Sequence, residues 1–275
     1  MPFNSLSYAT LTVIAAAISL LCMAPAAAQQ SVRVKSDGID IPAQLYKPAA
    51  AKAPAVALFH GCGGVGQNNT RMAGLLQSWG YVALVVDSFS SRGLKDVCGR
   101  NWPTQADAEK RALDIDAALT WLEEQPYVRT GQIGFMGYSY GGGVAALRTF
   151  APRVPAHVAL LVYPDCALAE PLGPKLDLRQ PTFVAMGALD DWTPVATCEA
   201  LFRRIATERD LLETHVYPGA HHSFDALGLP VRYLAGVGNR SKPGGCCGAH
   251  YGANEAAWKA FVGDVRTFLG KHLPP

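Results

Sequence analysis

Short apolar runs that do not alternate with polar residues constrain the fold of this chain most. Each run is bounded by Gly, Pro or Asp, and the runs span residues 55–59, 81–87, 132–136, 156–163, 181–186 and 214–217. Runs of this length are typical of strands that are buried on both faces, as in a parallel sheet. Before them, residues 31–36 and 39–46 alternate apolar and polar side chains around a Gly turn, which predicts an edge hairpin.

Segments with helical periodicity lie between the apolar runs. Between residues 107 and 124, Ile115, Ala118 and Leu122 recur every three or four residues and make one apolar face. A second stripe near the C-terminus consists of Trp258, Phe261, Val262, Val265, Phe268 and Leu269. Right-handed crossovers place such helices on both faces of a parallel sheet. We therefore expect an α/β fold with one doubly wound, mostly parallel sheet.

The N-terminal segment differs from the rest of the chain. An apolar run from Leu11 to Leu21 is followed by Ala26-Ala27-Ala28, as in a secretory signal peptide with a small-residue cleavage site. A membrane anchor is the alternative, but it needs about 20 apolar residues, whereas this run is shorter and Pro25 breaks its continuation. We expect a signal peptide over residues 1–28 and a single domain over residues 29–275, periplasmic or secreted, with no membrane partner after signal removal.

Charge and cysteine content narrow the classes of partner. The net charge is +2 and there is no basic stripe of the kind that binds a phosphate backbone, so we expect no nucleic-acid partner. If the chain is exported, all of its seven cysteines except Cys22 enter a compartment where disulfides persist. We expect at least one disulfide. No Cys-x-x-Cys pair accompanies a His pair, so no metal site is expected.

A Gly-x-Ser-x-Gly motif, Gly137-Tyr138-Ser139-Tyr140-Gly141, follows the third apolar run. A predicted strand precedes it, and the apolar residues after Gly143 favour a helix. This context is typical of a nucleophile elbow, in which side chains at the two glycines would collide with neighbouring backbone. The motif therefore predicts that Ser139 is a nucleophile.

A serine nucleophile needs a general base and an acid that orients the base, and in this fold they follow it in the order Ser, acid, His. Asp190 and Asp191 come just past the fifth apolar run, and His221 and His222 just past the sixth. Because catalytic groups gather at the carboxyl ends of parallel strands, these loops predict a triad with Ser139. Spacing alone leaves open which acid and which histidine take part.

The first apolar run leads into a glycine-rich loop, His60-Gly61-Cys62-Gly63-Gly64. Such a loop matches the oxyanion motif of esterases, which supplies a backbone N–H to the tetrahedral intermediate. We assign the two oxyanion donors to the N–H groups of Cys62 and Tyr140. A phosphate-binding loop is the alternative, but its Gly-Lys-Ser/Thr ending is absent. We expect His60 to organise this loop.

Two stretches, residues 165–180 and 226–253, show neither a clear strand nor a clear helix. Long loops rich in Gly and Pro often form the rims of functional sites. The two stretches are therefore candidate walls of the site, and plain surface loops are the alternative.

Together these segments resemble the dienelactone hydrolase family of α/β-hydrolases. The resemblance covers nearly all of the chain after the predicted signal peptide. It rests on the His60 loop, the Ser139 motif, and the segments at residues 186–194 and 217–224.

The family register distinguishes the adjacent acids and histidines. In the family, the acid lies four residues before a proline, and the base directly precedes Ser/Gly-Phe. The resemblance therefore implies that Asp190 rather than Asp191, and His222 rather than His221, complete the triad.

The chain departs from the founding members of this family at two positions. Founding members use a cysteine where Ser139 stands, which favours ordinary acyl-ester hydrolysis here, and they carry a glutamate in the oxyanion loop, where this chain has His60-Gly61-Cys62. The family's arginine that binds a substrate carboxylate falls near Arg92. The resemblance thus implies Arg92 as a substrate-binding residue, and a surface arginine is the alternative.

Positions near the predicted site suggest disulfide pairings. Cys166 follows a strand next to the acid-bearing strand and Cys198 follows the acid loop, so we predict that these two are joined. Our second prediction joins Cys62 to Cys98. The sequence indicates no partner for Cys246 or Cys247.

The combined expectation is a serine hydrolase that cleaves a small-molecule carboxylic ester or lactone through an acyl-enzyme on Ser139, without a cofactor. A peptidase or acyl-aminoacyl hydrolase is the enzymatic alternative, since related folds use the same order of triad residues. A protein that kept the fold but only binds ligands is the alternative from another class. The sequence leaves the oligomeric state open.

Overall fold

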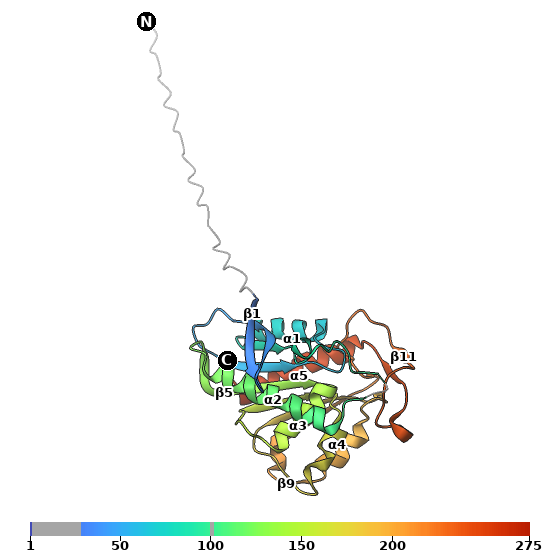
Figure 1. Ribbon diagram of the computed structural model, residues 1–275. Coiled ribbons are helices and arrows are strands. Elements are labelled where there is room, and N and C mark those ends of the chain that lie inside the picture. The colour runs from blue at the N-terminus through green and yellow to red at the C-terminus, as the bar shows by residue number, and fades with distance from the viewer. Residues whose placement is uncertain (2–28, 100–101) are drawn as a thin grey trace.

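The computed structural model describes residues 1, 29–99 and 102–275 (Figure 1). The expected signal peptide, apart from residue 1, lies outside the described residues. The remaining chain forms the α/β architecture that the apolar runs predict.

An eight-stranded sheet forms the centre of the molecule, with the strand order β1-β2-β4-β3-β5-β6-β8-β10. The hairpin strands β1 and β2 pair antiparallel, β2 pairs antiparallel with β4, and every later neighbour is parallel. The strands are β1 (Gln30–Ser36), β2 (Ile39–Tyr46), β3 (Ala53–Phe59), β4 (Val82–Val86), β5 (Val128–Tyr138), β6 (Val158–Val162), β8 (Thr182–Gly187) and β10 (Leu212–Tyr217). The mostly parallel sheet and its edge hairpin are thus as predicted.

Within the described residues, five helices cover the two faces of this sheet: α1 (Gln67–Ser78), α2 (Gln105–Glu123), α3 (Tyr140–Phe150), α4 (Val195–Phe202) and α5 (Glu255–His272). Helices α1 and α5 lie on one face, and α2, α3 and α4 lie on the other (Figure 1). In β3, Leu58 packs into the core under α1 and α5, whereas the next residue, Phe59, packs into the opposite core. Both faces of the strand are therefore apolar, which explains why the sequence does not alternate.

The two longest helices begin at capping residues. Before α2, the Thr104 hydroxyl accepts from the Asp107 N–H at 3.2 Å, and the Asp107 carboxylate accepts from the Thr104 N–H at 2.8 Å. Before α5, the Asn254 side chain accepts from the Ala257 N–H at 3.0 Å. These bonds satisfy donors that the first helical turn leaves unpaired.

Smaller elements occupy the two stretches that the sequence left unassigned. Residues 165–180 contain η2 (Cys166–Leu172) and β7 (Leu176–Asp177), which pairs with β9 (Ile205–Thr207). Residues 226–253 form a long excursion in which β11 (Arg232–Leu234) pairs with β12 (Ala249–Tyr251) around η4 (Pro243–Gly245). The other short turns of helix are η1 (Ser90–Arg92) and η3 (Arg209–Leu211). Within the described part of the chain, no helix has the length and apolarity needed to cross a membrane.

Three disulfides join the cysteines of the described chain. Cys62 is bonded to Cys98 and Cys166 to Cys198, with Cα–Cα distances of 5.0 and 5.1 Å. Both predicted pairings are confirmed. The two cysteines that the sequence left unpaired, Cys246 and Cys247, are bonded to each other.

Candidate active site

Ser139 occupies a strained turn between β5 and α3. Its backbone has φ 54° and ψ −119°, a conformation that residues other than glycine rarely adopt. A Cβ built on Gly141 would lie 2.6 Å from the Phe59 carbonyl oxygen, and one built on Gly137 would lie 2.7 Å from the Ala145 Cβ. Only glycine therefore fits on either side of the serine, as the motif predicts.

The structure brings Ser139, His222 and Asp190 into one chain of contacts. The Ser139 Oγ lies 2.8 Å from the His222 Nε2, and the His222 Nδ1 lies 2.8 Å from the Asp190 Oδ2. The three residues come from the carboxyl ends of β5, β10 and β8, and all three are at least 94% buried. A carboxylate at Nδ1 holds the imidazole so that Nε2 faces the serine hydroxyl.

The adjacent acid and histidine have different contacts. Asp191 accepts from the His250 N–H at 2.8 Å and contacts the His250 Nδ1 at 2.9 Å. The His221 ring lies 5.5 Å from the His250 ring. Both residues therefore face the 226–253 stretch rather than Ser139.

Three backbone and side-chain donors surround the Asp190 carboxylate. Its Oδ1 accepts from the N–H groups of Trp192 at 2.9 Å and Thr193 at 2.8 Å. The Thr193 hydroxyl lies 2.9 Å from the Asp190 Oδ2, 3.1 Å from the His222 Nδ1 and 3.0 Å from the Tyr163 carbonyl oxygen. Thr193 thus joins the acid and the base, a role that sequence reasoning missed.

Aromatic rings enclose the His222 imidazole. The Trp192 ring lies 4.9 Å from it, and the Tyr163 ring packs edge-on at 4.7 Å. The Tyr163 hydroxyl in turn donates to the buried Asp225 at 2.8 Å, and Asn68 donates to the other carboxylate oxygen at 3.1 Å. Burial raises the pKa of the Asp225 carboxyl. These contacts restrict the imidazole to one orientation.

The glycine-rich loop after β3 lies directly against Ser139. A Cβ built on Gly61 would be 3.3 Å from the Ser139 Cβ, which leaves no room for a side chain. Among the described residues, neither the Cys62 N–H nor the Tyr140 N–H has a hydrogen-bond acceptor. The Cys62 carbonyl accepts from the Val97 N–H at 2.9 Å, and the disulfide to Cys98 ties the loop to the same segment.

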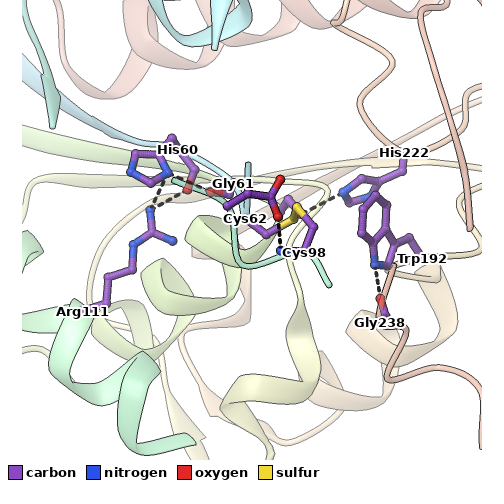
Figure 2. Close-up of a disulfide and its surroundings, with 10 residues drawn as sticks. His60, Gly61, Cys62, Cys98, Arg111, Trp192, His222 and Gly238 are labelled. Carbon is purple, nitrogen blue, oxygen red and sulfur yellow. Dashed lines mark hydrogen bonds between the residues drawn. A yellow bond between two sulfur atoms is a disulfide. The ribbon is translucent and has the colours of Figure 1, made fainter. Parts of the chain in front are cut away.

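His60 lies beside Gly61 and Arg111 and organises this loop (Figure 2). Its Nδ1 donates to the Gly61 carbonyl at 2.7 Å, and its Nε2 accepts from the Ser88 N–H at 3.2 Å. Burial, with a smaller contribution from the Arg111 charge, lowers the pKa of His60 to about 3. Arg111 donates to the His60 carbonyl at 2.6 Å and so supports the loop from α2.

Arg92 lies outside this arrangement. Its guanidinium forms two bonds to the buried Asp114, each 2.9 Å long, and a further bond to the Ser88 carbonyl. It is not among the residues that line the cavity beside Ser139. Its charge is thus paired with Asp114, and its role as a substrate-binding residue stays a prediction.

A cavity of about 400 Å³ opens beside Ser139. The 226–253 stretch contributes Leu229, Leu234 and Tyr251 to its wall, whereas the 165–180 stretch contributes no residue. The full lining is Gly61, Cys62, Gly63, Gly64, Gly66, Asn68, Asn69, Asp96, Cys98, Tyr138, Ser139, Tyr163, Trp192, His222, Ser223, Leu229, Leu234 and Tyr251. Among the described residues, no group of three His, Cys, Asp or Glu side chains could hold a metal ion.

Gly238 joins three loops around this cavity. Its carbonyl accepts from the Trp192 indole N–H at 2.8 Å, in the loop that carries Asp190. Its N–H donates to the Cys98 carbonyl at 2.9 Å, next to the disulfide with the glycine-rich loop. Figure 2 shows Gly238 below Trp192, with His222 beside the same indole.

Comparison with known proteins shows the family of this chain. The family model for the dienelactone hydrolase family matches residues 41–269. A relative from Bradyrhizobium sp., assigned by name as a 2-oxo-3-(5-oxofuran-2-ylidene)propanoate lactonase, is 26% identical over 70% of this chain and 82% of its own length. A relative from Synechocystis sp., assigned by name as a carboxymethylenebutenolidase, is 22% identical over 70% of this chain and 85% of its own.

Solved structures share the fold. The dienelactone hydrolase of Anabaena variabilis superposes with a TM-score of 0.63 at 19% identity, covering 90% of this chain and 98% of that one. Esterase 2 of Thermogutta terrifontis, phosphorylated by paraoxon, gives a TM-score of 0.59 at 18% identity, covering 91% and 96%. Since the family model spans more than half of the sequence, the chain belongs to the dienelactone hydrolase family and is a carboxylic ester hydrolase.

Proposed function

We propose that this protein hydrolyses small carboxylic esters or lactones through an acyl-enzyme on Ser139. The observation that carries the proposal is the chain of 2.8 Å contacts from Ser139 through His222 to Asp190, at the wall of the cavity. A serine hydroxyl becomes a competent nucleophile when a positioned imidazole accepts its proton.

In the first half-reaction, the Ser139 Oγ attacks the carbonyl carbon while His222 takes the hydroxyl proton. The N–H groups of Cys62 and Tyr140 stabilise the oxyanion that forms, since both are free to donate. His222 then returns the proton to the leaving alkoxide, and the ester C–O bond breaks. For a lactone, the alcohol formed stays attached to the acyl group.

In the second half-reaction, a water molecule replaces the alcohol. His222 accepts a proton from the water, which attacks the acyl carbon, and the Ser139 Oγ leaves with that proton. Asp190 stabilises the imidazolium in both halves and is itself held by Thr193. Each step uses groups of this chain, the substrate and water.

The experiment is labelling with a fluorophosphonate probe, followed by hydrolysis of an ester series of increasing acyl length and one lactone. We expect labelling and turnover by the wild type and neither by Ser139→Ala. Equal labelling of Ser139→Ala would contradict the nucleophile assignment. Turnover of amides but not esters would favour the peptidase alternative, and ligand binding without any labelling would favour the binding protein.

We also propose that residues 1–28 are a signal peptide and that the mature domain, residues 29–275, is periplasmic or secreted. Support comes from the sequence of this segment and from the disulfides Cys62–Cys98 and Cys166–Cys198, which persist in oxidising compartments. The test is expression of the full chain in a bacterium with Sec export. We expect a periplasmic product whose mass corresponds to a chain that begins at Gln29. An uncleaved cytoplasmic product would contradict the proposed signal peptide.

A further inference from the structure

Apart from the triad residue His222, the only charged side chain among the described residues that line the cavity beside Ser139 is acidic. Among the described residues that line it there is no Lys or Arg, whereas Asp96 contributes a carboxylate. We infer that Asp96 makes this site prefer esters whose alcohol part is cationic or neutral over esters that carry a carboxylate. The inference rests on the proposed function and names the substrate class of the same site.

The position of Asp96 is fixed relative to the oxyanion loop. Its Oδ1 accepts from the Cys98 N–H at 2.7 Å, and Cys98 is bonded to Cys62. Its Oδ2 would lie 3.8 Å from a Cβ built on Gly63, in the same loop. Among the described residues, no cation forms an ion pair with this carboxylate. Its charge is thus available to a substrate that enters beside Ser139.

Two other acids near the cavity, Asp190 and Asp225, do not compete with the charge of Asp96. Asp190 is paired with His222 at 2.8 Å, so its charge is offset when the imidazole is protonated. Asp225 is fully buried behind Tyr163 and Asn68, which donate to its two oxygens. Neither carboxylate is among the lining residues.

Two arginines of neighbouring elements are paired with other carboxylates. Arg92 is paired with Asp114, and Arg240 is paired with Asp165. Among the described residues, Arg232 is held against a lining side chain: its Nη2 donates to the Tyr251 hydroxyl at 2.6 Å. Arg232 does not itself line the cavity, but it is the group that could attract an anion, and the experiment includes it.

The remaining wall suits an uncharged or cationic alcohol group. Leu229 and Leu234 provide apolar surface, and Trp192 and Tyr251 provide aromatic rings. Aromatic faces attract quaternary ammonium groups as well as alkyl groups of the same shape. A carboxylate in the same place would lose its water shell and meet the Asp96 charge, with no Lys or Arg among the described lining residues to pair with it.

The test compares matched acetate esters: that of choline, that of 3,3-dimethylbutanol, which is its neutral isostere, and one with a carboxylate at the same position. We measure kcat/KM for the wild type and for Asp96→Asn, which keeps the acceptor for Cys98. The control is Asp37→Asn in the β1–β2 turn, which changes the net charge equally outside the cavity.

At low ionic strength, Asp96→Asn should lower the cationic-to-neutral ratio of kcat/KM by about 3- to 10-fold and raise the anionic-to-neutral ratio by a similar factor. Both effects should shrink when salt shortens the range of the charge. Asp37→Asn should retain the wild-type ratios. Ratios that are equal in the wild type and Asp96→Asn would overturn the inference. So would a wild-type preference for the anionic ester that Arg232→Gln removes.

A binding measurement separates this inference from the proposed mechanism. Non-hydrolysable ether analogues of the cationic and neutral esters are titrated calorimetrically into Ser139→Ala, with and without Asp96→Asn. Tighter binding of the cationic ether that depends on Asp96 supports the inference, and equal binding contradicts it. Hydrolysis that persists in Ser139→Ala would contradict the nucleophile assignment alone, because this preference is measured without turnover.

Discussion

Asp190 and Asp191 are neighbours in the sequence, yet their carboxylates contact histidines in different parts of the site. The Asp190 Oδ2 lies 2.8 Å from the His222 Nδ1, whereas the Asp191 Oδ2 lies 2.9 Å from the His250 Nδ1. Asp190 is 6% exposed, and Asp191 is only partly buried at the base of the β11–β12 excursion. One acid therefore faces the base, and the other anchors a wall of the cavity.

Asparagine at the two positions should have opposite effects on catalysis and on the wall. Asp190→Asn should lower kcat about 1,000- to 10,000-fold with little change in KM, because the imidazole loses the acceptor that fixes its tautomer. Asp191→Asn should retain kcat within about tenfold but release residues 226–253, which limited proteolysis would detect. The measurement is steady-state kinetics of both variants on one ester. A larger loss of kcat in Asp191→Asn than in Asp190→Asn would exchange the two roles.

Thr193→Val should lower kcat about tenfold, because the loss of a hydroxyl that contacts both Asp190 and His222 removes roughly 1 to 2 kcal/mol of positioning energy. KM should hardly change, since Thr193 is not among the lining residues. Thr193→Ser keeps the hydroxyl and should recover most of the activity. If the serine variant were as slow as the valine variant, the methyl group rather than the hydroxyl would be the important part.

The two long-range disulfides form a matched pair for testing the oxyanion loop. They close segments of 36 and 32 residues, so Cys98→Ser and Cys198→Ser should each lower the free energy of unfolding by about 3 to 4 kcal/mol. Only Cys98→Ser releases the loop that carries the Cys62 N–H. It should lower kcat, and the affinity for a boronic acid that forms a tetrahedral adduct, by about tenfold or more. Equal kinetic losses in both variants would indicate a general loosening instead.

Acid should destabilise the folded protein through His60. Its pKa is about 3 when buried and about 6.5 when unfolded, so the unfolded chain binds a proton that the folded protein does not. The contribution is complete above pH 6.5 and is lost as the pH falls towards 3, by up to about 1.4 kcal/mol per pH unit. Urea unfolding between pH 4.5 and about 7 should therefore show a shallower pH slope for His60→Gln. The exposed His157→Gln should follow the wild type, and a His60→Gln slope equal to the wild-type slope would contradict this account.

The central strands could be predicted because burial on both faces leaves a direct trace in the sequence. All six apolar runs became parallel strands, and the alternating hairpin became β1 and β2. Helix α1 left a weaker trace, since its buried face is short and its first turn, Gln67-Asn68-Asn69, is polar. Strands β11 and β12 are three residues long, so no periodicity can develop in them.

The residues of the triad could be placed by chain order, but their surroundings depend on distant parts of the chain. The sequence does not show that Arg92 is paired, because its partner Asp114 lies 22 residues further on, in α2. The sequence indicates no role for Thr193 beyond its place before a proline. Nothing in it shows that the Tyr163 carbonyl, at the end of β6, accepts from the Thr193 hydroxyl. A hydroxyl three residues after a candidate acid is the signal that could have revealed it.

Gly238 has a consequence for directed evolution of this enzyme. Any side chain there would meet the Gly99 carbonyl oxygen at 2.8 Å and the Trp102 ring at 3.0 Å, which would push apart the three loops that Gly238 joins. Libraries aimed at new substrates should therefore randomise Leu229, Leu234 and Tyr251 and leave Gly238 fixed. In such libraries the shape of the pocket can change while the spacing between the oxyanion loop and Asp190 stays the same.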